Sequence, residues 1–175
     1  MRFPTGAGRI AAAAVGIPRT SVEGVGSERV MDAARHLGLE VELVERPAAD
    51  SLEGAAALLG LDPASIVKSL VVARSDGTFL FALVPGDRQI AWAKLRAAVG
   101  VNKLRLPSAE EALGATGYER GTITPLGSST AWPVFADERI TGRIAMGAGA
   151  HGMSAFVEAD ALLKALDATV ADITT

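Results

Sequence analysis

The chain has 175 residues, a formal net charge of −3, 49% hydrophobic residues and 21% charged residues, which is the balance of one globular domain. It has no cysteine and only two histidines, His36 and His151. Thiol chemistry, disulfides and zinc–thiolate sites are therefore excluded, and we expect neither a metal site nor a cofactor. Duplex DNA binders carry a clear basic excess, so we expect no DNA partner.

Residues 1–26 form a predicted flexible N-terminal extension. The apolar stretch Ile10 to Ile17 is much shorter than the roughly 20 residues that a membrane span needs. An arginine-containing leader with an alanine run loosely matches a secretory signal, but Gly16 and Pro18 interrupt its weak apolar part. We therefore expect no membrane contact, a cytoplasmic location and a folded domain at 27–175.

The elements are predicted from hydrophobic period, caps and turns. The first 65 residues predict a helix capped by Ser27 and ended by Gly38, a strand at 40–45, a helix opened by a capping box at Asp50 and Glu53 and ended by Gly60, and a turn at Pro63. The middle predicts strands at 66–73 and 78–84 joined by a turn at 75–77, a helix from Trp92 ended by Gly100, a short strand at 101–106, and a helix with a capping box at Ser108 and Glu111.

The last third predicts strands at 133–136, 143–146 and 154–157 and a final helix at 159–166. The order lacks the regular strand–helix alternation of a doubly wound parallel sheet. We therefore predict an α+β fold, a single domain with a curved, mixed, mainly antiparallel sheet flanked by helices.

Lys68 is the most unusual residue of the predicted strands. Side chains alternate across a strand, so Lys68 shares a face with Ile66, Leu70 and Val72, and both faces are largely apolar. Lysine is almost never fully buried without a partner. Either Lys68 extends its amine to water along its own stem, or it points into a cavity and presents a cation to a ligand.

Two glycine-rich loops offer bare backbone to a ligand. The loop 121–127 brackets a Thr-Pro pair with glycines, and the loop 147–152 contains His151. Neither carries the Lys-Ser/Thr of a phosphate-binding loop, and a strand rather than a helix follows the second. Both loops are also compatible with ordinary tight turns. His151 could bind a phosphate or a base, act as an acid or base, or be a solvated loop side chain.

These segments resemble the YbaK/prolyl-tRNA editing family of aminoacyl-tRNA deacylases over about residues 27–173. The resemblance is carried by the order and spacing of several segments, none decisive alone: Ile66-Val67-Lys68-Ser69-Leu70, Val84-Pro85-Gly86-Asp87, Thr116-Gly117-Tyr118, Thr124-Pro125-Leu126-Gly127, Val134-Phe135-Ala136-Asp137, Gly149-Ala150-His151-Gly152 and 167–173.

The resemblance implies a hydrolase that cleaves a mischarged small amino acid, such as alanine, cysteine, serine or threonine, from the 3′ end of transfer RNA. It implies no metal and no protein nucleophile, with water as the attacking group. It places Lys68 at the family's essential lysine, where it would anchor the terminal adenosine or phosphate, or orient the ester. It also implies a substrate-binding set made up of Gly121, Thr124, Pro125, Gly127, Gly147, Gly149, His151, Gly152 and Ser154.

Two positions depart from the family members that edit cysteinyl-tRNA. Those members have serine where this chain has Gly147 and aspartate where it has Ser154. The alternatives are therefore a module of the same fold that binds a nucleotide or RNA end without catalysis, and a partner protein that docks on a synthetase.

Overall fold

The computed structural model describes residues 21–46 and 49–175. Most of the predicted extension, residues 1–20, lies outside that part. The elements are α1 Ser21–Leu37, β1 Glu42–Glu45, α2 Leu52–Leu59, the 3₁₀ turn η1 Pro63–Ser65, β2 Val67–Arg74, β3 Phe79–Pro85, α3 Trp92–Val99, β4 Leu104–Arg105, α4 Ala109–Thr116, β5 Val134–Asp137, β6 Arg143–Gly147, β7 Met153–Glu158, α5 Ala159–Ala165 and β8 Thr169–Ala171. No helix among the described residues is long and apolar enough to cross a membrane.

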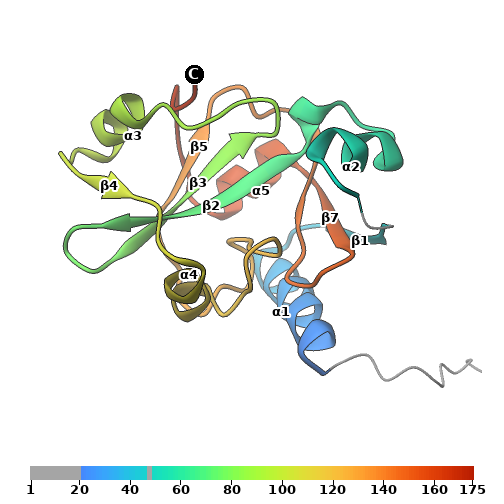
Figure 1. The fold of residues 1–175 in the computed structure, drawn as a ribbon. Coiled ribbons are helices and arrows are strands. Elements are labelled where there is room, and N and C mark those ends of the chain that lie inside the picture. The colour runs from blue at the N-terminus through green and yellow to red at the C-terminus, as the bar shows by residue number, and fades with distance from the viewer. Residues whose placement is uncertain (1–20, 47–48) are drawn as a thin grey trace, which may run out of the picture.

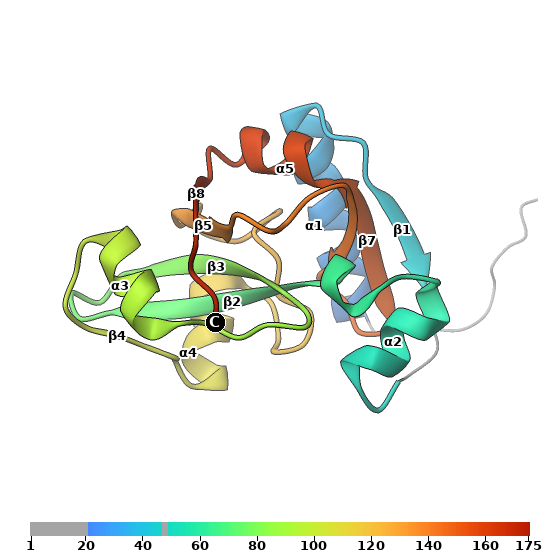
Figure 2. The same cartoon turned by 90° about the horizontal axis from the view of Figure 1, so that it is seen from above.

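Two sheets make up the predicted α+β fold. Three strands pair in the order β1-β7-β6, and five pair in the order β4-β2-β3-β5-β8. The pairs are antiparallel except β3–β5 and β5–β8, which are parallel. Within the described residues, one bridge joins the two sheets: it pairs Ile66, just before β2, with Ala145 of β6. Figure 2 shows the three-stranded sheet and α3 at opposite ends of the long β2–β3 hairpin.

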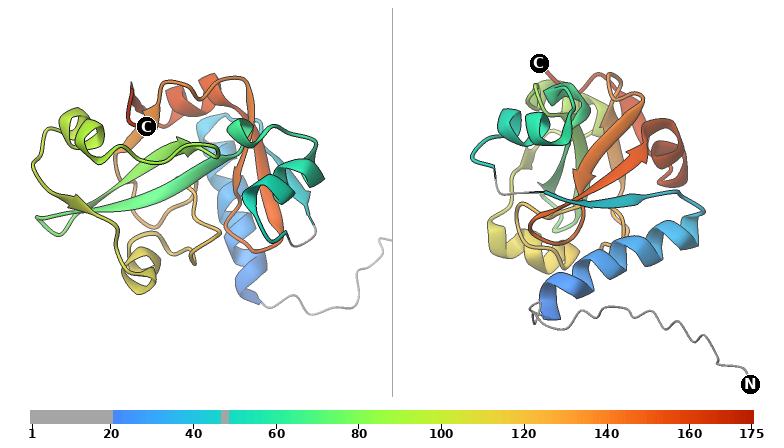
Figure 3. Two further views of the ribbon diagram at one scale, coloured as in Figure 1. Left: turned by 45° about the horizontal axis from the view of Figure 1, so that its top comes forward. Right: turned by 90° about the vertical axis from the view of Figure 1, so that its right-hand side faces the viewer.

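The β2–β3 hairpin is covered on both faces, as its apolar sequence predicts (Figure 1). Val71 and Leu83 face a core that also takes in Val30 of α1, the three-stranded sheet and α5. Val72 and Leu80 face a second core built with α3 and the C-terminal segment. Figure 3 shows α1 running beside the three-stranded sheet. The central strands are therefore held from both sides.

Two predicted helix starts are corrected. The first helix begins at Ser21, so Ser27 lies inside it rather than at its N-cap. Glycine normally weakens a helix interior, but Gly26 is buried where an added Cβ would overlap the carbonyl oxygen of Gly149. The second helix is capped by Ser51, whose hydroxyl accepts from the Gly54 amide, and not by Asp50.

Other predicted helix ends and caps are confirmed. Gly60 and Gly100 end their helices in the left-handed conformation, which glycine adopts without strain. Ser108 and Glu111 form the predicted capping box, with both reciprocal hydrogen bonds present. This cap fixes the start of α4, which borders the site described below.

The C-terminal segment is fixed by one buried carboxylate. Asp137 at the end of β5 is fully buried and accepts hydrogen bonds from the Ile173 amide and the Thr174 hydroxyl, each at 3.0 Å. Burial alone would raise the pKa of Asp137, but these bonds and those from Arg139 together lower that pKa below its usual value. The carboxylate therefore stays ionised and holds the segment that follows β8 (Thr169–Ala171) against the end of β5.

Candidate functional site

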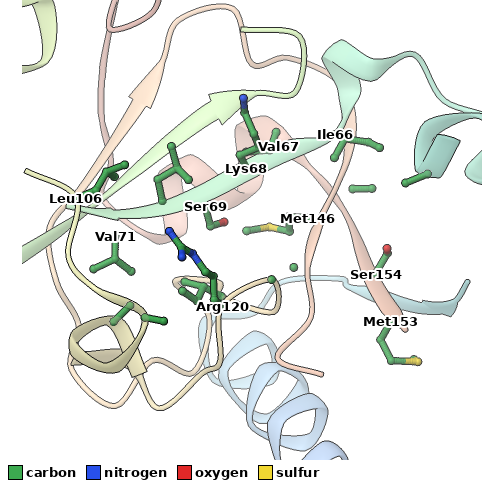
Figure 4. A pocket seen from close by; sticks show the side chains of 18 of the residues that line it. Ile66, Val67, Lys68, Ser69, Val71, Leu106, Arg120, Met146, Met153 and Ser154 are labelled. Atoms are coloured by element: carbon green, nitrogen blue, oxygen red, sulfur yellow. The ribbon is translucent and has the colours of Figure 1, made fainter. Parts of the chain in front are cut away.

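A cavity of about 310 Å³ lies along β2 where the two sheets meet (Figure 4). Its walls come from β2, the ends of β6 and β7, the start of α4, and the loop that begins at Gly121. Val67, Ile123, Ala145, Met146 and Met153 give it an apolar lining. The volume is at the small end of the range for ligand pockets, roughly 300–1,000 Å³.

The wall formed by β2 is an unpaired strand edge. The amide of Gly86 donates to the Ile66 carbonyl at 2.7 Å and that of Arg74 to the Thr78 carbonyl at 2.8 Å, so even-numbered residues of β2 hydrogen-bond to the β3 side. Because the direction alternates along a strand, the peptide groups of Ser69 and Val71 face the cavity. Within the described chain, the other strand pairings on this edge are only at Ile66, Ala73 and Arg74.

Ser69 adds a free hydroxyl to this wall. Its Oγ is buried and has no hydrogen-bond partner in the part of the chain that the structure describes. Figure 4 shows it pointing from β2 toward Met146. Buried hydroxyls are nearly always paired in proteins. This hydroxyl is therefore available to a ligand's polar group.

The cavity is positively charged although the protein is not. Three of its lining residues are basic, Arg46, Lys68 and Arg120, and among the described residues no aspartate or glutamate lines it. The chain as a whole has 20 acidic and 17 basic residues. Charges confined to a low-dielectric cleft produce a local potential that the net charge does not reveal.

Lys68 borders this cavity, but its amine does not point into it. Nζ donates to the carbonyl oxygen of Arg88 at 2.5 Å, and Figure 4 shows the side chain on the other side of β2 from Ser69 and Arg120. Of the two alternatives for Lys68, the amine that points into the cavity is therefore not the conformation observed. Burial lowers the pKa of Lys68, and the carboxylate of Asp87 acts in the opposite direction.

The predicted glycine-loop residues divide into two groups. Gly121, Gly147 and Ser154 line the cavity with Lys68. The others that we predicted do not line it: Thr124, Pro125, Gly127, Gly149, His151 and Gly152. Pro125 and Gly127 instead border a separate hollow of about 820 Å³ beside α1, and the amide of Gly149 is occupied by the Thr122 carbonyl at 2.9 Å.

The loop 121–127 is held from behind by Arg29 and Tyr118. The Arg29 guanidinium donates to the carbonyls of Thr116, Gly117 and Gly127 and stacks over the Tyr118 ring, 4.6 Å from its centroid. The Tyr118 hydroxyl donates to the Leu126 carbonyl at 2.7 Å, and burial raises the pKa of Tyr118 to about 12, so it remains a neutral donor. These contacts hold the end of the loop whose earlier residues Gly121 and Ile123 line the cavity.

Two further predicted residues have protein partners. His151 is exposed and its Nε2 lies 3.1 Å from a carboxylate oxygen of Glu119. Ser154 Oγ accepts from Nε of Arg46 at 3.0 Å, which fixes that arginine at the cavity. Within 21–46 and 49–175, no three histidine, aspartate or glutamate side chains gather as a metal site.

The sequence analysis does not predict Arg46, Arg120 or the free edge of β2 as parts of the site. Arg46 and Arg120 lie in segments without a motif, and only the packing of β2, β7 and α4 brings them to one cavity. The free edge depends on β4 pairing with β2 at only two positions. A strand of two residues leaves no clear periodic signal.

Comparison with known proteins identifies the class. A family model described as "Aminoacyl-tRNA editing domain" matches residues 46–165, which contain every residue that lines the cavity. This chain belongs to the aminoacyl-tRNA editing domain family.

Relatives and solved structures agree. The chain is 30% identical over 112 residues to "Proline--tRNA ligase" of Bacillus licheniformis, covering 64% of this chain but 19% of that protein. It is 29% identical over 127 residues to "Putative Cys-tRNA(Pro)/Cys-tRNA(Cys) deacylase EbsC" of Enterococcus faecalis, covering 71% of this chain and 77% of that one. A structure titled "Crystal structure of a putative trans-editing enzyme for prolyl tRNA synthetase" superposes with a TM-score of 0.79 at 28% identity, covering 86% of this chain and 97% of that one. The chain thus spans about a fifth of the ligase it matches.

Proposed function

We propose that this protein hydrolyses the ester that joins a wrongly attached small amino acid to the 3′ end of transfer RNA, acting in trans. The observation that carries the proposal is that the editing-domain match encloses the whole cavity. Two of the proteins named above support the same substrate class, since one is named as a putative deacylase of Cys-tRNA(Pro) and Cys-tRNA(Cys) and the other as a putative trans-editing enzyme for prolyl-tRNA synthetase.

The chemistry proposed for the cavity is positioning and electrostatics. Water attacks the ester carbonyl carbon, and the carbonyl oxygen, as it gains charge, accepts hydrogen bonds from the cavity-facing amides of Ser69 or Val71. The bond from that carbon to the ribose oxygen then breaks, and the proton lost by the water goes to that oxygen, which leaves as the ribose hydroxyl of the transfer RNA. The Ser69 hydroxyl binds a second polar atom of the aminoacyl group. Lys68 orients the ester after its amine leaves the Arg88 carbonyl. The amides of the two glycine loops contribute less to stabilising the carbonyl oxygen, because the amides of Thr122 and Gly149 already donate to the carbonyls of Glu119 and Thr122.

The size of the cavity favours a small amino acid. A volume of about 310 Å³ must hold the amino acid and part of the terminal ribose. Alanine, serine, cysteine and threonine fit this requirement better than large side chains.

We further propose that the protein works in the cytoplasm, where transfer RNA is charged, and that a synthetase is a candidate docking partner.

A non-catalytic binding module is the second candidate. One observation favours it: within the described chain, no carboxylate lines the cavity and His151 lies outside its lining, so no side-chain general base is evident. Substrate-assisted attack of water removes the need for such a base, and the deacylase proposal depends on that.

The test is a deacylation panel with the purified protein. Transfer RNA charged with alanine, serine, cysteine, threonine or proline, correctly and wrongly matched, is incubated and the amino acid released is measured over time. We expect one wrongly matched small amino acid to be released well above the spontaneous rate, and prolyl-tRNA to be spared. Retained RNA binding with no release of any amino acid would replace the deacylase with the binding module.

A further inference from the structure

Arg120 stands out among the charged residues at the cavity. It follows Glu119 at the start of the loop 121–127, and its side chain is exposed. It makes no side-chain hydrogen bond or ion pair with any residue that the structure describes. Figure 4 shows its guanidinium directed at β2, beside Ser69 and Val71. An unpaired arginine directed into a cavity has its donors available for a ligand.

The chemistry of the ligand determines what this charge can bind. The inference rests on the proposed function only in taking the ligand to be an aminoacylated RNA end. In that ligand the amino acid is an ester with no carboxylate, and its α-amino group, when protonated, is repelled by a cation. The base and sugar are neutral. The phosphate is therefore the only group that an arginine attracts electrostatically.

We propose that Arg120 binds the phosphate of the terminal nucleotide of the RNA. Arg46, fixed by its hydrogen bond to Ser154, adds to the positive potential of the same cavity. The amine of Lys68 is turned to the Arg88 carbonyl, so the two arginines supply the charge that the cavity presents. This arrangement lets a protein of net charge −3 recognise one phosphate at an RNA end without a broad basic surface.

Binding measurements test the proposal without relying on catalysis. The affinities of adenosine and adenosine 5′-monophosphate are compared by calorimetry for the wild type, Arg120→Ala and Arg35→Ala. Arg35 is a matched control, since it is an exposed arginine on α1 away from the cavity. We expect the wild type and Arg35→Ala to prefer the monophosphate by about tenfold, the size of a charged hydrogen bond, and Arg120→Ala to lose the preference.

A second measurement uses uncharged transfer RNA. Its affinity is measured against salt concentration, where each lost phosphate contact lowers the slope of log K against log salt by about 0.7. We expect that loss in Arg120→Ala and not in Arg35→Ala. An unchanged slope and an unchanged monophosphate preference in Arg120→Ala would overturn the proposal, even if the protein hydrolyses its substrate. An Arg120-dependent preference in a protein that hydrolyses nothing would keep the phosphate site and reject the deacylase.

Discussion

Replacing Lys68 with alanine is expected to lower the rate of deacylation by about a hundredfold or more, the usual effect of removing one electrostatic group from a catalytic site. The fold should survive, because the substitution removes one hydrogen bond, to the Arg88 carbonyl, worth about 1 kcal/mol. The measurement is the single-turnover rate on the best substrate of the panel, together with a thermal unfolding curve.

Lys94→Ala is the matched control, because this lysine pairs with Asp172 on the surface and lies outside the cavity lining. Lys68→Arg separates the positive charge from the shape of the amine and should keep part of the rate. A Lys68→Ala variant as active as the wild type would remove Lys68 from the mechanism. That result would leave the edge of β2 as the principal catalytic element.

Gly147→Ser is expected to destabilise the protein by about 2–3 kcal/mol and lower its Tm by about 5–10 °C. A Cβ at Gly147 would overlap the carbonyl oxygen of Ile123 and lie 3.1 Å from that of Thr122. Both atoms are backbone, so either the end of β6 or the loop 121–127 must move. Serine at this position therefore should not convert the chain to cysteine editing, and deacylation should fall with stability.

The control for that substitution is Gly114→Ser in α4. An added Cβ there meets nothing within 4 Å, so the change of residue type is the same without the overlap. Thermal unfolding of both variants and the wild type gives the comparison. A Gly147→Ser protein as stable as Gly114→Ser would show that the loop yields easily and that the glycine is not required by packing.

The hairpin of β2 and β3 was predictable because the strand pattern and the turn residues indicate the same structure. Both faces are apolar, a Ser-Asp-Gly turn joins the strands, and the register observed follows from it. β8 was not predicted, since Thr169–Ala171 is three residues long and gains its identity only by pairing with β5. The prediction that a flexible segment ends at Gly26 is wrong, because this glycine lies inside α1 and permits close packing there.

For the site, the alternation along β2 predicts which residues share a face, but it does not predict which face borders the cavity. It placed Lys68 and Ser69 on opposite faces, which is correct, yet both faces are apolar, so nothing indicated that the Ser69 face would border the open part of the cavity. The charge of the cavity was equally hidden. Arg46 and Arg120 are 74 positions apart, and only the folded chain brings them to one cavity.

The most direct test of the central claim, that this cavity is where an aminoacyl ester is hydrolysed, is to block it. Ala109 is exposed at the start of α4 and lines the cavity, so Ala109→Trp adds a large ring to the cavity wall with little effect on the core. Ala93→Trp, on the exposed side of α3, adds the same ring elsewhere. The account predicts that the wild type and Ala93→Trp release a wrongly matched amino acid from transfer RNA at equal rates, and that Ala109→Trp is slower by about tenfold or more, because the ester no longer reaches its position. Equal rates in all three proteins would contradict it.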